Sequence, residues 1–77
     1  MISFSRHKIP ALLNAANEVA VEAFLQGQIR FDQIHWVNQS TLEGTSVPAP
    51  ANLGDLLEID TRARAEATRW VQKLQSA

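Results

Sequence analysis

PALLNAANEVAVEAFLQG, residues 10–27, is the stretch that decides the fold. Alanine and leucine dominate it, its proline suits a first helical turn, and Gly27 stands where a left-handed C-terminal cap is needed. Apolar residues recur at spacings of three and four, as on one face of an amphipathic helix: Leu13, Ala16, Ala20 and Phe24. Small side chains in this stretch would let another helix approach closely. The pattern predicts a central helix of a bundle over residues 10–26.

A second helix is predicted between Asp32 and Gly44. The Asp32 carboxylate can accept hydrogen bonds from the free N–H groups of a helix start, and Gly44 can end the helix. One face would be apolar, with Trp36 on its flank: Ile34, Val37, Thr41 and Leu42. The following residues 45–51 contain two prolines, which disfavour helix in the residues before them, and are predicted to form an extended loop.

The last segment carries a nearly heptad pattern: Leu53, Leu56, Asp60, Ala63, Ala67, Trp70 and Leu74. Asp60 is the one polar residue in that stripe, and two interpretations fit. Either one long helix carries a partly buried carboxylate, or the helix breaks and Asp60 caps a new one. The break is favoured because it would satisfy the carboxylate locally. We therefore predict a short helix at about 53–59 and a longer one from 61 to about 75.

These elements predict an all-α fold, a small helical bundle of three long helices plus one short helix, with mostly antiparallel neighbours. A length of 77 residues favours a single domain with a thin stability margin. We expect Phe24, Trp70 and Leu74 to be largely buried in its core.

Composition and charge narrow the function classes. The chain has no cysteine, which excludes disulfides, thiolate zinc sites and cysteine nucleophiles. Its net charge of −1 argues against a nucleic-acid partner, and no apolar run approaches the ~18 residues of a membrane span. We expect a cytoplasmic protein without nucleic-acid or membrane partners. Acidic residues concentrate in the middle and basic residues in 61–77, so we expect pairing within the molecule.

The usual catalytic patterns do not appear in the sequence. Its three glycines are isolated, so they form neither a dinucleotide loop nor a P-loop. Asp32 and His35 stand three apart, but no second pair of metal ligands follows. Glu18 and Glu22 lie one helical turn apart, as carboxylates on solvated helix faces commonly do. We predict no catalytic, cofactor-binding or metal-binding residue in this chain.

One polar cluster stands out within the first helix: Asn14, Asn17 and Glu18. Asparagine has only moderate helix propensity, so two asparagines in an Ala/Leu-rich helix suggest that their side chains make specific interactions. The side chains could bond to neighbouring loops or to the helix's own N-terminus. Alternatively, this end of the helix makes polar contacts with another domain.

The run NAANEVAVEAFL, residues 14–25, followed by GQIRF, residues 27–31, closely resembles the C-terminal region of 1-deoxy-D-xylulose 5-phosphate reductoisomerases. The resemblance continues more loosely through DLLEID, residues 55–60, and covers roughly residues 10–75. Residues 1–9 depart from the family's small-residue lead into this helix. We therefore divide the chain into a divergent or artificially added lead, residues 1–9, and a C-terminal helical domain, residues 10–77.

The resemblance implies a function for the whole enzyme rather than for this part. Members combine an NADPH-binding domain, a catalytic domain that holds a divalent metal, and a C-terminal helical bundle, and they make methylerythritol phosphate for isoprenoid biosynthesis. The family's cofactor, metal and phosphate sites lie upstream of the matched region. The chain alone is therefore expected to be inactive and to bind neither NADPH nor metal. Its expected partners are the catalytic domain, which it would support, and copies of itself. The alternative is a stand-alone helical protein-interaction module.

Overall fold

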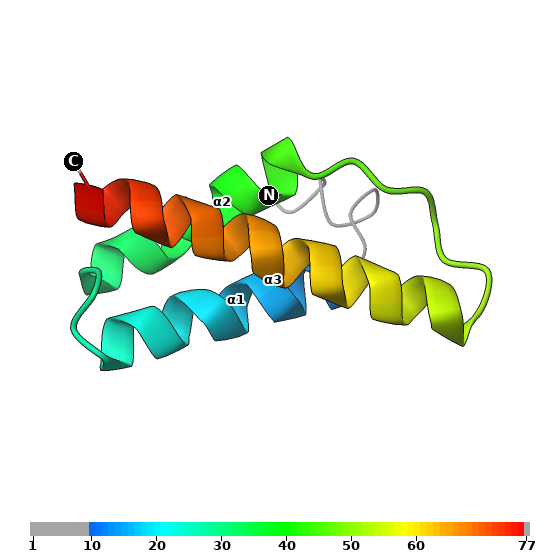
Figure 1. Cartoon of the computed structure of the whole chain (residues 1–77), viewed down its shortest axis with the longest axis horizontal. Helices are drawn as coiled ribbons and strands as arrows, with labels where there is room; N and C mark the ends of the chain where they lie inside the picture. Colours follow the sequence, from blue (N-terminus) through cyan, green and yellow to red (C-terminus); the bar gives the residue numbers. More distant parts are fainter. Residues whose placement is uncertain (1–9, 77) are drawn as a thin grey trace.

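The computed structural model describes residues 10–76, which form three α-helices (Figure 1). Helix α1 spans Pro10–Leu25, α2 spans Phe31–Gly44 and α3 spans Leu53–Ser76. Successive helices run antiparallel, whereas α1 and α3 run parallel because the loop at 45–52 returns the chain to the end where α1 begins (Figure 1). The predicted all-α bundle is confirmed.

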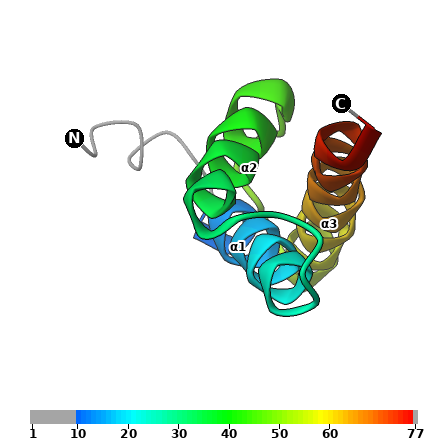
Figure 2. The same cartoon turned by 90° about the vertical axis from the view of Figure 1, so that its left-hand side faces the viewer.

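Seen along the helix axes, α1 lies at the vertex between α2 and α3 (Figure 2). It packs against both of them, and α2 and α3 also touch each other. None of the described helices is both long enough and apolar enough to cross a membrane.

The core is built mainly from small side chains. Buried alanines come from α1 and α3: Ala15, Ala16, Ala20, Ala23, Ala63 and Ala67. Larger buried residues fill the two ends, with Leu12, Leu42 and Ile59 in one cluster and Ile29, Val37 and Val71 in the other. Because a methyl group occupies little space, the backbones of α1 and α3 can lie close together.

Phe24, Trp70 and Leu74, which were predicted to be largely buried, pack against the core cluster without entering its centre. All three are only partly buried, at the margin of the core. Alanines occupy the centre of the interface, so larger side chains stand at its edges. There Phe24 meets Phe31 edge-on, with ring centroids 5.6 Å apart, and Trp70 meets Trp36 in the same way at 5.3 Å.

The predicted break at Asp60 is also wrong, because α3 is one continuous helix. The bundle therefore has three helices among its described residues, without the extra short one. Asp60 is satisfied one turn later by Arg64, whose Nε donates to its carboxylate at 2.8 Å. The buried residues of α3 follow a spacing of four instead of the expected heptad: Ile59, Ala63, Ala67 and Val71.

The helix ends agree with the sequence at some positions only. Gly27 has φ +76°, the left-handed conformation predicted for the end of α1. Asp32 does not cap α2, since the helix begins at Phe31 and the side chain of Gln33 accepts a hydrogen bond from the backbone N–H of Arg30 at 2.7 Å. Asn52 caps α3 by accepting from the Asp55 N–H at 2.9 Å.

Candidate interaction surface

The polar cluster predicted on α1 lies on the surface and ties the three helices together. Glu18 accepts a hydrogen bond from the Arg64 guanidinium of α3, and Asn14 donates to the same carboxylate at 3.4 Å. Asn17 accepts from the Asn38 amide of α2 at 2.9 Å. The three side chains thus make contacts within the bundle, from an exposed position. Their predicted polar contact with another domain stays a prediction.

Arg64 is the centre of this polar cluster. Its hydrogen bonds to Asp60 and then to Glu18 raise the pKa of the guanidinium above its already high value. A permanent cation therefore holds one carboxylate of its own helix and one of α1. This contact confirms the expected pairing between the acidic middle of the chain and its basic last segment.

A groove of about 440 Å³ lies between α1 and α3 beside this ion pair. Its lining combines aliphatic residues with polar ones: Glu18, Val19, Glu22, Ala23, Gln26, Gln28, Arg64, Thr68 and Val71. Glu18 and Glu22, one helical turn apart, have different partners. Glu22 accepts a hydrogen bond from the Gln26 amide, and Glu18 accepts one from the Arg64 guanidinium. These contacts assign structural roles to both carboxylates.

Potential metal ligands do not converge in the described part of the chain. Within residues 10–76, no group of three or more histidine, aspartate or glutamate side chains is placed to hold a metal ion. Asp32 instead pairs with Arg30, from Nε to carboxylate at 3.2 Å, and a hydrogen bond from that guanidinium lowers the pKa of Asp32.

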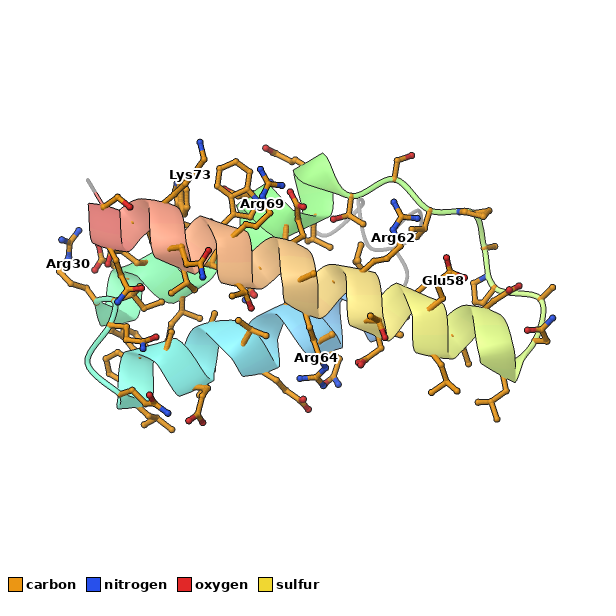
Figure 3. The ribbon with its side chains drawn as sticks, viewed as in Figure 1. Arg30, Glu58, Arg62, Arg64, Arg69 and Lys73 are labelled. Atoms are coloured by element: carbon orange, nitrogen blue, oxygen red, sulfur yellow. The ribbon has the colours of Figure 1, made fainter. Side chains whose placement is uncertain are left out.

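Basic and aromatic side chains share another face of α3. Figure 3 shows Arg62, Arg69 and Lys73 along one side of the helix. Arg69 pairs with Glu66 at 2.9 Å, and the Lys73 ammonium lies 5.5 Å from the ring centre of Trp70. Arg69 and Lys73 are thus held partly by neighbours on their own helix.

Two groups of exposed apolar side chains lie at opposite ends of the molecule. At one end Leu25 and Phe31 flank the turn between α1 and α2, with 70% and 73% of their surface exposed. At the other end Leu53, Leu56 and Leu57 open α3, with 68%, 38% and 61% exposed. This second group was unexpected from the sequence, because the heptad pattern had placed Leu53 and Leu56 in the core. The sequence signal for these exposed leucines was the run DLLEID, residues 55–60, because two adjacent leucines on a helix point in different directions.

Fold and surface together define a small all-helical domain with exposed apolar side chains at both ends. A family model described as the DXP reductoisomerase C-terminal domain matches residues 2–66. The chain belongs to this family of C-terminal domains.

Curated relatives agree with this assignment. The chain is 48% identical over 64 residues to a 1-deoxy-D-xylulose 5-phosphate reductoisomerase of Pseudomonas fluorescens (strain SBW25), covering 83% of this chain and 16% of the relative. It is 54% identical over 56 residues to the enzyme of the same name from Solibacter usitatus (strain Ellin6076), covering 73% and 14%. The chain thus spans about a sixth of the length of such relatives.

Proposed function

We propose that this chain is the non-catalytic C-terminal domain of a 1-deoxy-D-xylulose 5-phosphate reductoisomerase and that it supports the catalytic domain of that enzyme. The family match over residues 2–66 is the observation that carries the proposal. The structure adds support, because the polar side chains on α1 and α3 are used to join helices rather than gathered around a reaction centre.

The whole enzyme would act in isoprenoid biosynthesis in the cytoplasm. Its NADPH and divalent metal would be bound by the parts of the protein outside this domain. Asn14, Asn17 and Glu18 would add polar contacts to the catalytic domain from the surface of α1, since all three are exposed and retain hydrogen-bonding capacity beyond the bonds described.

A chimera tests this function. The C-terminal region of the Pseudomonas fluorescens relative is replaced by the matching residues of this chain, and reductoisomerase activity is measured. We expect an active chimera, because the domain supplies packing and not chemistry. In parallel, the chain alone is titrated with NADPH and with Mg²⁺ in a calorimeter. Saturable micromolar binding of either by the chain alone, or a folded but inactive chimera, would contradict the proposal.

We further propose that the isolated chain forms homo-oligomers. Its exposed leucines and Phe31 would be removed from water by contact between copies. A two-fold dimer is the commonest closed arrangement, and a stable one buries roughly 1,000 Å² or more. Sedimentation at several concentrations checks this, and a strictly monomeric chain at about a hundred micromolar would count against it.

A further inference from the structure

The beginning of α3 extends past the beginning of α1. Ile59 and Ala63 of α3 pack in the same core cluster as Leu12 and Ala15, which belong to the first two turns of α1. Because the two helices run parallel, residues 53–58 of α3 project beyond the start of α1 (Figure 1). Their length corresponds to about 9 Å of helix at 1.5 Å per residue.

Two leucines on this projection, Leu53 and Leu57, lie on the side of α3 where α1 would be if it were longer. Leu53, Leu57 and Arg64 are separated by four and seven residues, so they share one helix face. Arg64 identifies that face, because it reaches Glu18 of α1. Figure 3 shows Arg64 directed toward α1 and Glu58 directed to the other side of α3.

This position determines what can cover the leucines. The chain enters α1 at Pro10, at the same end of the bundle as the projecting part of α3 (Figure 1). The family is one of C-terminal domains, and the matched region is 16% of a full-length relative, so most of a full-length member precedes this domain. The point at which the chain enters the described bundle therefore lies at the same end as the leucines.

We propose that Leu53, Leu56 and Leu57 form the docking surface for the part of the reductoisomerase that precedes this domain, through an apolar segment lying in line with α1. This inference rests on the proposed function. A docked leucine loses its exposure to water, whereas the isolated chain leaves Leu53 and Leu57 with 68% and 61% of their surface exposed.

The far end of the molecule provides a matched control. Leu25 is 70% exposed, close to the 61% of Leu57, but it lies at the end of α1 that is remote from the entry of the chain. Polar substitution at both positions removes the same apolar side chain. A difference in docking between the two variants would therefore reflect where the docking surface lies and not a general effect of leucine on solubility.

Hydrogen exchange and stability of the active chimera test the docking surface. We expect backbone amides of residues 56–60 to exchange at least tenfold more slowly in the chimera than in the isolated chain at a concentration where that chain is monomeric, and those of residues 25–31 to change little. L57Q should weaken docking about ten- to a hundredfold in the chimera, seen as faster exchange at 56–60, and should leave the isolated chain folded. L25Q should leave exchange at 56–60 unchanged.

The contrary outcomes separate the two proposals. An active chimera in which residues 56–60 stay unprotected and L57Q has no effect overturns the docking surface and leaves the proposed function standing. Protection at 56–60 that rises with the concentration of the isolated chain, with no further gain in the chimera, assigns the surface to a second copy and also overturns it. A folded but inactive chimera with residues 56–60 protected supports the surface and contradicts the proposed function.

Discussion

The guanidinium of Arg64 on α3 holds the carboxylate of Glu18 on α1, 46 residues earlier in the chain. The same guanidinium is hydrogen-bonded to Asp60 on its own helix, at 2.8 Å. Arg64 and Glu18 keep 42% and 54% of their side-chain surface exposed, so water and salt screen their attraction. The ion pair therefore links the two parallel helices at a small net gain in stability.

A double-mutant cycle of Glu18→Ala and Arg64→Ala should give a coupling free energy of about 0.5–1 kcal/mol, smaller in molar salt. Urea unfolding in low and high salt measures it. The Arg30 and Asp32 pair, which is 72% and 71% exposed, serves as a control and should couple less strongly. A coupling of several kcal/mol that salt leaves unchanged would contradict the screened geometry.

Ala67→Leu should destabilise the domain by roughly 1–3 kcal/mol or more, because Ala67 is fully buried in the core cluster shared by α1, α2 and α3 and added carbons would force the helices apart. Thermal unfolding followed by circular dichroism measures the change. Ala65→Leu, two residues away on the exposed side of α3, is the control and should stay within about 0.5 kcal/mol of the parent. Equal effects at the two positions would disprove the close alanine packing.

Thr61→Pro distinguishes a continuous α3 from a helix that restarts after Asp60. In a continuous helix, proline at 61 removes a backbone hydrogen bond and clashes with the Leu57 carbonyl, at a cost of about 3 kcal/mol or more. In a new helix, proline would occupy the favourable first position. Leu53→Pro, at the true start of α3, is the control and should be tolerated. A stable, fully helical Thr61→Pro variant would instead support a new helix that starts after Asp60.

Thr41→Val should stabilise the domain by about 1 kcal/mol. The Thr41 side chain is fully buried, and its hydroxyl finds no hydrogen-bond partner within residues 10–76. Valine keeps the shape and removes the desolvated hydroxyl. Thr68→Val is the control, because the Thr68 hydroxyl is exposed and donates to the Arg64 carbonyl at 2.8 Å; we expect little change there. Urea midpoints compare the two variants, and a destabilised Thr41→Val would indicate an internal water bound at the hydroxyl.

Local signals in the sequence predicted α1, its left-handed end at Gly27 and the buried face of α2. The same reasoning failed at Asp60, where a capping preference was weighed without Arg64, which lies four residues later on the same face and satisfies the carboxylate. It was incomplete at Phe24 and Trp70, which pack at the margin of the core and not in its centre. Hydrophobic size alone does not reveal that alanines hold the helices too close for large rings to enter.

The candidate surface was predictable to a lesser degree. Asn17 and Glu18 were recognised as unusual, but their partners Asn38 and Arg64 come from other helices, and their proximity depends on how the helices are aligned. The exposed leucines at the start of α3 depend on α3 being longer at that end than α1. Relative helix lengths in space are set by tertiary packing and do not appear in periodicity.

The alanine-rich interface between α1 and α3 also shapes the response of the domain to temperature. A methyl group removes little apolar area from water, and the heat-capacity change of unfolding scales with that area. Alanine also loses no side-chain rotamer freedom when it is buried. Its smaller free-energy gain from burial is therefore opposed by a smaller loss of conformational entropy. We therefore expect a heat-capacity increment at or below the usual ~12–15 cal/mol/K per residue. The resulting stability curve would be shallow, so that folding is insensitive to moderate cooling.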